Sequence, residues 1–264
     1  MHRTTSVIVT VVAALAGLGA ALAAKPPSGE LVVFEAASLK EAFATLAARF
    51  ERDHPGAHVV TNAAGSQELR AQIEHGAVAD VFASADQRHM SVLAGEGLVV
   101  GPALFACNEP VVVVRSGLGG TLKTFADLPR AERIVVGAPE VPIGGYTVQI
   151  FQKAAARYGA DFAARLQGKI VSRELNVRQV LAKVVLGEAD AGIVYRSDAI
   201  AAKGKETIAV VPIPPDLNVT AAYPIATLKA APRPELARAF VDLVRSPTGA
   251  TVLREAGFVP CPGP

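Results

Sequence analysis

The chain has 264 residues, with 26 Lys and Arg against 24 Asp and Glu, and 51% of its residues are hydrophobic. This length allows one large domain or two ordinary domains with a full core. The nearly balanced charge, with no basic face, argues against a nucleic-acid partner.

Residues 1–24, "MHRTTSVIVTVVAALAGLGAALAA", have the pattern of a secretory signal peptide. An early arginine precedes a long apolar stretch without acids, and alanines end it, as at a small-residue cleavage site. An uncleaved anchor is the alternative reading, but two internal glycines and the Pro-Pro-Ser-Gly spacer that follows favour cleavage. We therefore predict a cleaved chain exported to the periplasm.

Short apolar strands alternate with helical patterns along most of the remaining chain. The predicted strand–helix pairs are 31–36 with a helix from 39, 58–64 with 66–76, 79–85 with 86–97, 133–139 with 147–159, 169–175 with 176–189, and 190–195 with 196–204. This alternation predicts an α/β fold with mainly parallel sheets and helices on both faces. The strands are continuously apolar, as expected when both faces of a sheet are covered.

Two segments interrupt this rhythm and predict two lobes. Residues 105–120 hold a long apolar strand and a Gly-rich break, and residues 210–228 form an extended stretch with several prolines. If both are crossings, the first lobe comprises residues 25–106 plus 224–264 and the second residues 107–223. Helices at 234–246 and 247–257 then pack back on the first lobe, and the two crossings form a hinge beside a cleft.

Several predicted helices begin with residues typical of helix caps. Ser38 with Glu41 matches a capping box, Ser66 is a good N-cap, and Asn176 with Gln179 has the same spacing. "PIGGY", residues 142–146, is a glycine-containing turn that leads into a predicted helix. Helix starts carry free N–H groups and partial positive charge, and in open sheets ligands bind beyond the carboxyl ends of the strands. Single N-caps are usually structural, so these turns alone indicate only a candidate site for a small anion.

The sequence holds no recognisable catalytic or metal-binding motif. "SGLGG" lacks the Lys-Ser/Thr of a phosphate-binding loop, and no C-x-x-C or H-E-x-x-H pattern occurs. His54 and His58 are separated by Pro55, which prevents a shared helix face. We therefore predict no enzyme activity, no catalytic residue and no cofactor. Cys107 and Cys261 can form a disulfide in an oxidising compartment or remain two free thiols, and the sequence leaves both open.

The same helix starts resemble those of the periplasmic molybdate-binding proteins of ABC-type molybdate importers. The similar blocks are "FEAASLKEAF", "AAGSQELRAQIEHGAVADVFASAD", "GAPEVPIGGY" and "NVRQVLAKVVLGEADAGIVYRSDA". They occur in order and span nearly all of the chain after the signal. The resemblance implies a type II periplasmic binding protein with two hinged lobes.

What the family binds gives each of these blocks an expected role. The resemblance implies that molybdate, and tungstate with it, is enclosed between the lobes by neutral donors. Ser38 and Ser66 would offer hydroxyls and amides, Ile143 and Val177 backbone N–H groups, and Tyr195 its phenol. Molybdenum would be bound only as this oxyanion, through the same residues. The closed protein, a monomer, would dock on the membrane permease and ATPase subunits of an importer.

Glu35 departs from the family pattern, which has a small apolar residue at this place. A carboxylate in the cleft would repel a dianion, so Glu35 raises the alternative of a receptor for sulfate or phosphate. An anion-binding enzyme on the same scaffold is a further alternative and would need an acid or base in the cleft. A ligand-sensing module is disfavoured because no DNA-binding or signalling segment is recognisable.

Overall fold

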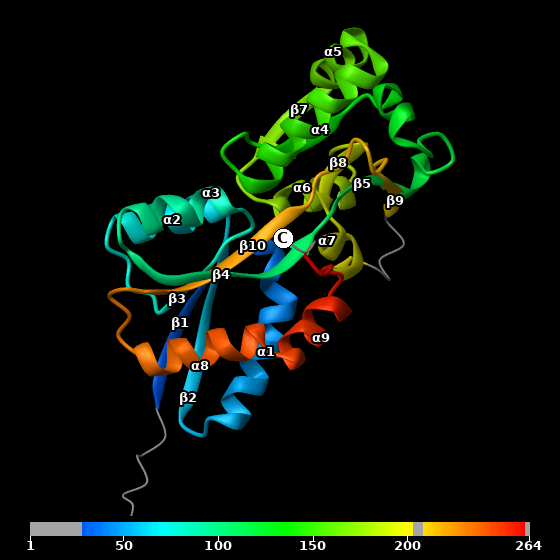
Figure 1. Cartoon of the computed structure of the whole chain (residues 1–264). Coiled ribbons are helices and arrows are strands. Elements are labelled where there is room, and N and C mark those ends of the chain that lie inside the picture. Colours follow the sequence, from blue (N-terminus) through cyan, green and yellow to red (C-terminus); the bar gives the residue numbers. More distant parts are fainter. Residues whose placement is uncertain (1–27, 203–207, 262–264) are drawn as a thin grey trace, which may run out of the picture.

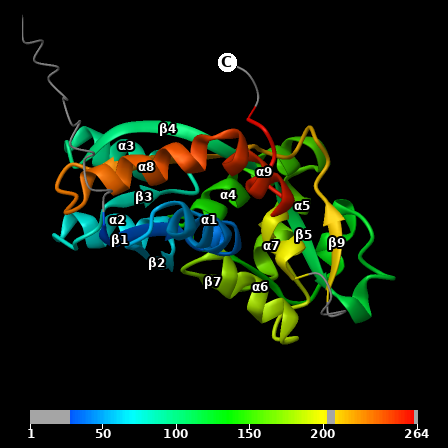
Figure 2. The same cartoon turned by 90° about the horizontal axis from the view of Figure 1, so that it is seen from below.

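The computed structural model describes residues 28–202 and 208–261, which form two lobes lying side by side (Figures 1 and 2). Each lobe is built on a five-stranded sheet flanked by helices. The two-lobed α/β fold expected from the sequence is therefore confirmed. The predicted signal peptide lies outside the described residues.

The sheet of the first lobe has the strand order β2-β1-β3-β10-β4. Its strands are β1 (Gly29–Ala36), β2 (Ala57–Ala64), β3 (Val81–Ala83), β4 (Val99–Asn108) and β10 (Ala221–Leu228). Strand β1 pairs in parallel with β2 and β3, whereas β10 is antiparallel to β3 and β4. The carboxyl ends of β1, β2 and β3 therefore meet at one edge of the sheet.

The sheet of the second lobe has the order β7-β6-β8-β5-β9. Its strands are β5 (Pro110–Arg115), β6 (Ile134–Gly137), β7 (Ile170–Glu174), β8 (Ala191–Tyr195) and β9 (Ile208–Pro212). Here β6 pairs in parallel with β7 and β8, and β5 is antiparallel to β8 and β9. The two sheets thus share one plan.

In each sheet the reversed strand is the one that follows a crossing between the lobes. Strand β4 leads through Glu109 into β5, and β9 leads through residues 213–220 into β10. The sheets are consequently mixed, with two parallel and two antiparallel pairings each, where the sequence predicted mainly parallel ones. Apolar runs are typical of any strand covered on both faces, so composition could not reveal the reversals.

Helices cover both faces of the first sheet (Figure 1). They are α1 (Lys40–Asp53), preceded by the 3₁₀ turn η1 (Ala37–Leu39), α2 (Ser66–Glu74), α3 (Gln87–Gly95), α8 (Pro234–Arg245) and α9 (Pro247–Glu255). On one face Phe50 and Phe43 of α1 meet Phe240 of α8 edge-on, with ring centroids 5.4 and 5.8 Å apart. Helices α8 and α9 both pack against α1 in the first lobe.

The second lobe has four α-helices among its described residues, and its boundaries differ in part from those predicted. They are α4 (Pro142–Tyr158), α5 (Ala160–Gly168), α6 (Val177–Val185) and α7 (Arg196–Ala201), with the 3₁₀ turns η2 (Ser116–Leu118) and η3 (Phe125–Arg130). Helix α4 begins at Pro142, five residues before the predicted start, because proline is well suited to the first helical position. Helix α5 was not predicted and packs on α4.

A disulfide between Cys107 and Cys261 settles the question that the sequence left open. The backbone of Cys107 also pairs with that of Val259, with N–O distances of 3.1 and 2.8 Å in the two directions. Cys107 is the penultimate residue of β4, just before the crossing. The last described residues of the chain are therefore fastened beside the hinge.

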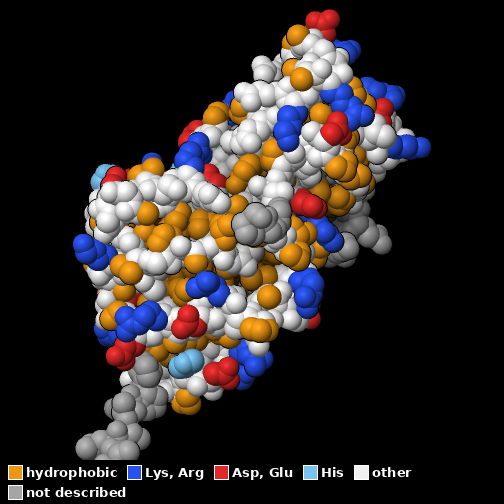
Figure 3. All heavy atoms as spheres, viewed as in Figure 1, with side chains coloured by type: hydrophobic (Ala, Val, Ile, Leu, Met, Phe, Trp, Pro, Cys, Tyr) orange, Lys and Arg blue, Asp and Glu red, His pale blue; other side chains and the backbone are white. Residues whose placement is uncertain are grey.

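The face seen in Figure 3 carries basic and acidic side chains interspersed over both lobes. Apolar side chains gather along β4, the edge strand of the first sheet, where Val100 and Leu104 are exposed. Within residues 28–202 and 208–261, no helix has both the length and the apolar character needed to traverse a bilayer.

Candidate functional site

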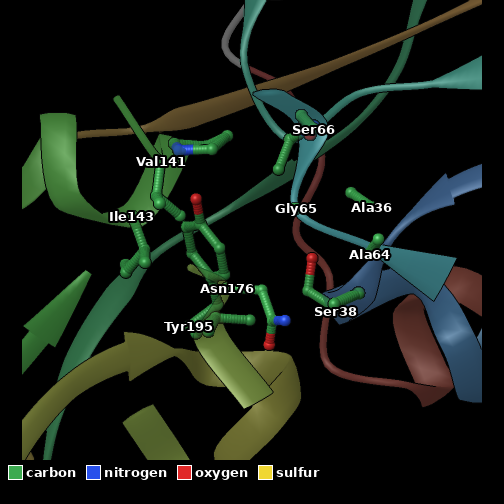
Figure 4. Close-up of a pocket in the computed structure, with 13 residues that line it drawn as sticks. Ala36, Ser38, Ala64, Gly65, Ser66, Val141, Ile143, Asn176 and Tyr195 are labelled. Atoms are coloured by element: carbon green, nitrogen blue, oxygen red, sulfur yellow. The ribbon is translucent and has the colours of Figure 1, made fainter. Parts of the chain in front are cut away.

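One pocket lies between the lobes, at the carboxyl ends of several strands (Figure 4). Residues of the first lobe form one wall and residues of the second lobe the other. Its lining is Ala36, Ala37, Ser38, Ala64, Gly65, Ser66, Ala85, Val141, Pro142, Ile143, Asn176, Val177 and Tyr195. All five residues that the sequence analysis selected are therefore brought together around this pocket.

Ser38 lies in the tight turn between β1 and α1, where the chain forms one 3₁₀ turn. Its hydroxyl is not an N-cap: it lies 2.9 Å from the hydroxyl of Tyr223 on β10. Glu41 does not reach back to the turn and instead pairs with Arg178. The predicted capping box is therefore wrong, because long-range partners take both side chains.

Ser66 is the first residue of α2, and the N-cap is Gly65. The Gly65 amide donates to a carboxylate oxygen of Glu68 at 3.0 Å. The hydroxyl of Ser66 instead accepts the Ala85 amide at 3.0 Å. Ser66 was predicted to be the cap, so that prediction is wrong by one residue. Since the Ser66 oxygen already accepts a bond, its own hydrogen is left to point elsewhere.

Ile143 lies in the first turn of α4, where backbone N–H groups have no acceptor within the helix. The turn is packed closely against the end of β6. A Cβ on Gly144 would lie 1.8 Å from the Ala138 carbonyl oxygen, whereas the same atom on Gly145 would have its nearest neighbour at 3.5 Å. The first glycine of "PIGGY" is thus required for this packing.

Val177 opens α6, and the predicted cap before it is confirmed in part. The Asn176 side chain accepts the amides of Arg178 and Gln179 at 3.0 and 3.1 Å. The Gln179 side chain accepts the Leu175 amide rather than that of Asn176. The Asn176 cap leaves the amide of Val177, the first of the helix, without a side-chain cap.

Tyr195 ends β8 and precedes α7. Its side chain is buried, and its hydroxyl has no hydrogen-bond partner among the described residues. Figure 4 shows this hydroxyl directed into the space between the two walls. Burial raises the pKa of the phenol well above its usual value, and neighbouring groups, Tyr223 first among them, raise it further. The phenol is therefore a protonated donor without an acceptor in the described part of the chain.

Arg178 is a cation next to this site, and it forms ion pairs with two acidic side chains. It pairs with Glu41 across the lobes and, through Nε at 2.9 Å, with the fully buried Asp198. Burial raises the pKa of Asp198 to about 6, although Arg178 and the Tyr195 amide lower it. Asp198 is therefore mostly ionised at neutral pH, and its charge offsets that of the arginine.

Glu35 is buried but does not line the pocket. It follows Leu31 and Val33 in the alternation of β1, on the face that packs against α1, and neither carboxylate oxygen has a hydrogen-bond partner among the described residues. Burial, with the nearby charge of Glu41, raises the pKa of Glu35 to about 8, while Lys40 lowers it. At neutral pH Glu35 is therefore mostly uncharged.

Hydrogen bonds join the two lobes on both sides of the pocket. The Gln67 amide donates to the Leu175 carbonyl oxygen at 2.6 Å. On the other side the Glu140 carbonyl oxygen accepts Arg88 at 2.6 Å and lies 2.9 Å from a ring nitrogen of His89. The structure is therefore a closed arrangement of the lobes.

The lining of the pocket, as far as the structure describes it, has hydroxyls and amides but no carboxylate, imidazole or thiol. Nor do the described residues contain a group of three or more His, Cys, Asp or Glu that could hold a metal ion. The sequence analysis did not select Gly65 or Ala85, although both lie in motifs it quoted. It had no signal for Tyr223, which reaches Ser38 from 185 positions away in the chain.

These observations define a two-lobed solute-binding protein with its pocket between the lobes. A family model agrees: the chain belongs to the bacterial extracellular solute-binding proteins, whose model matches residues 31–259. The chain is 40% identical over 255 residues to the molybdate-binding protein ModA of Mycobacterium tuberculosis, covering 94% of this chain and 93% of that protein.

Two solved structures share the fold. The periplasmic molybdate-binding protein of Azotobacter vinelandii has a TM-score of 0.77 and 22% identity, covering 88% of this chain and all of that one. The sulfate-binding protein SubI of M. tuberculosis has a TM-score of 0.78 and 18% identity, covering 87% and 86%. The fold alone therefore does not select between these two anions.

Proposed function

We propose that this protein captures molybdate, and tungstate with it, in the pocket between its lobes and delivers it to an ABC importer. The observation that carries the proposal is the buried hydroxyl of Tyr195, which lies beside two serine hydroxyls and has no hydrogen-bond partner within residues 28–202 and 208–261. A tetrahedral oxyanion in the pocket would accept hydrogen bonds from all three of these hydroxyls. The 40% identity to a molybdate-binding protein supports this choice of anion.

The proposed contacts use neutral donors from both lobes. Ser38 and Ser66 give their hydroxyls and the amides of their helix starts, Ile143 and Val177 give backbone N–H groups, and Tyr195 gives its phenol. Helix starts bring partial positive charge to the same place. The anion would bridge the two walls, so binding would stabilise the closed arrangement.

The strength of such a cage is sufficient for capture. A hydrogen bond to a charged group contributes about 1.5–3 kcal/mol, so about seven of them exceed ~10 kcal/mol before the costs of association. Those costs are large, which makes micromolar or tighter binding the expectation. Because all of these groups donate, the cage would favour anions that carry no proton.

The proposal is for a binding protein without catalysis and without a cofactor. It is supported by the lining, which offers no acid or base within the described residues. We place the protein in the periplasm as a monomer that docks on permease and ATPase subunits. The family match and the signal pattern at residues 1–24 support this location.

A receptor for sulfate is the second candidate, because the sulfate-binding protein SubI has the same fold. Sulfate is also a tetrahedral dianion without a proton at neutral pH, so the donors listed above would suit it. Glu35 does not strengthen this candidate, because it lies outside the pocket lining. The size of the cage would then have to distinguish the two anions.

Titration calorimetry on the purified chain tests the proposal, since the protein has no tryptophan for fluorescence. Molybdate, tungstate, sulfate and phosphate are titrated separately at neutral pH. One-to-one binding of the first two with no heat from the others is the expected result. Binding of sulfate alone would establish the second candidate, and no heat from any of the four would contradict both.

A further inference from the structure

Tyr223 lies behind the pocket wall, where it contacts Ser38 through its hydroxyl and Tyr195 through its ring. Its side chain is fully buried, and its hydroxyl oxygen lies 2.9 Å from the hydroxyl oxygen of Ser38. Tyr223 is not part of the lining. Tyr223 therefore makes its hydrogen bond to the lining through Ser38, and Tyr223→Phe would remove that bond while keeping the ring.

Three aromatic rings hold Tyr223 in place. Its ring meets Phe258 at 5.3 Å, Tyr195 at 5.8 Å and Phe105 at 6.4 Å between centroids, all close to edge-on. Phe258 precedes Val259, which is itself paired to Cys107 beside the disulfide. The tyrosine hydroxyl thus has a fixed position relative to Ser38.

The direction of the bond between Tyr223 and Ser38 follows from their neighbours. The Asn108 carbonyl oxygen accepts the Glu109 amide at 3.0 Å, so its NH₂ group is directed the other way, where it donates to Ser197 at 2.8 Å. Asn108 is thus engaged elsewhere, and Ser38 is the hydrogen-bond partner of the Tyr223 hydroxyl among the described residues. If Ser38 were the donor, the hydrogen of this buried phenol would have no acceptor there, so Tyr223 donates and Ser38 keeps its own hydrogen for the pocket.

The hydroxyl of Ser66 also accepts a hydrogen bond from behind the pocket wall, and here the donor is a backbone amide. The Ala85 N–H can only donate, and it lies 3.0 Å from the Ser66 oxygen. A hydroxyl has one hydrogen to give, so a serine that accepts a bond from behind directs its hydrogen forward. Ser38 and Ser66 would then both accept a hydrogen bond from behind the pocket wall and direct their own hydrogens into the pocket.

We propose that Tyr223 is a positioning residue that donates to Ser38 and so directs the hydrogen of Ser38 toward the oxyanion. This inference rests on the proposed function. It adds a selectivity role: with the hydrogens of both serines directed at the anion, neither hydroxyl is oriented to accept the hydrogen of a protonated anion such as hydrogen phosphate. Discrimination of this kind comes from leaving a polar group unpaired, which is costly in a buried site.

The test is a double-mutant cycle on molybdate affinity with Tyr223→Phe and Ser38→Ala. Tyr223→Phe is expected to weaken binding about tenfold in the wild-type background and less than about twofold in the Ser38→Ala background. A purely structural role would weaken binding equally in both. Equal losses in the two backgrounds would therefore overturn the inference.

The selectivity role is tested by competition with phosphate at neutral pH. After correction for the affinity of molybdate itself, phosphate is expected to bind Tyr223→Phe about tenfold more tightly, relative to molybdate, than the wild type. An unchanged ratio, or no displacement by phosphate from the variant, would overturn this role. Tyr158→Phe is the matched control, because Tyr158 is the last residue of α4 and lies outside the pocket lining, and it should change neither result.

The two proposals fail in different ways. A wild-type protein that binds no molybdate contradicts the proposed function and with it the role of Tyr223. A wild-type protein that binds molybdate, with additive losses in the cycle, contradicts only the role of Tyr223. Thermal unfolding of each variant without ligand shows whether the fold is intact.

Discussion

Gly65 in the first lobe lies directly against the carbonyl oxygen of Leu175 in the second. A Cβ built on Gly65 would be only 2.4 Å from that oxygen, although the backbone of Gly65, at φ −63°, suits any residue. Two atoms of the Gln67 side chain, in the same lobe, would lie as close, at 2.4 and 2.6 Å, but this side chain is flexible, whereas the Leu175 oxygen belongs to the backbone. The requirement for glycine here therefore concerns mainly the contact between the lobes, where Gln67 also donates to that oxygen.

Gly65→Ala should accordingly hinder closure while leaving the lobes folded. Molybdate affinity is expected to fall at least about tenfold, because the two walls can no longer meet around the anion. The free energy of unfolding without ligand should change by less than about 1 kcal/mol. Calorimetry and urea unfolding measure the two quantities.

Gly95→Ala serves as the control, because nothing lies within 4 Å of a Cβ at that position. Small-angle scattering adds a direct measure of shape, since the wild type should become more compact with ligand and Gly65→Ala should not. Wild-type affinity in Gly65→Ala would show that closure does not bring these two atoms together.

Removing single donors should weaken binding by amounts that identify them. Ser38→Ala, Ser66→Ala and Tyr195→Phe are each expected to cost about 1–3 kcal/mol in molybdate binding, through loss of one hydrogen bond to a charged group. Ile143→Val keeps the backbone N–H and should cost almost nothing. The proposed residue roles would be refuted by the reverse pattern, in which the serine variants keep wild-type molybdate affinity and Ile143→Val loses it.

Glu35 should make stability depend on pH in a defined direction. Burial raises its pKa from the ordinary 4.5 to about 8 in the folded state, so the folded protein keeps a proton that the unfolded chain releases. The associated stability is fully present below pH 4.5 and is lost as pH rises to about 8. Glu35→Gln removes this dependence.

Urea unfolding at about pH 5 and about pH 9 checks the effect. The variant should be close to the wild type at the lower pH and more stable by a few kcal/mol, about 2–4, at the higher one. Glu30→Gln, on the same strand but exposed, is the control. A parallel pH dependence of the wild type and Glu35→Gln would show that this carboxyl is not buried uncharged.

The disulfide should contribute to stability because it closes a long loop. Cys107 and Cys261 are 154 positions apart, and replacing both with alanine should lower the free energy of unfolding by about 2–5 kcal/mol. A reductant should destabilise the wild type similarly and leave the double variant unchanged. Insensitivity of the wild type to reductant during urea unfolding would contradict the bond.

The lobed fold and the helix starts around the pocket could be predicted from local patterns in the sequence, whereas the choice of individual site residues, Tyr195 among them, came from the resemblance to a known family. Apolar runs mark strands, and small residues before helices mark the turns at their ends. The predicted hydrogen-bond partners of three polar side chains were wrong. Ser38, Glu41 and Ser66 were expected to cap nearby helices, but they contact residues distant in the sequence, namely Tyr223, Arg178 and Ala85. Local propensity favours a cap, and tertiary contacts override it wherever a buried donor needs an acceptor.

The position of β10 has a consequence for how the chain assembles. This strand lies between β3 and β4, yet its residues, 221–228, follow every strand of the second lobe. A chain that emerges N-terminus first can therefore complete the sheet of the second lobe while the first still lacks an inner strand. Tyr223 arrives with that strand, so a chain that lacks β10 has neither a complete first sheet nor the hydroxyl that bonds Ser38, and the anion site proposed above cannot form until β10 is in place.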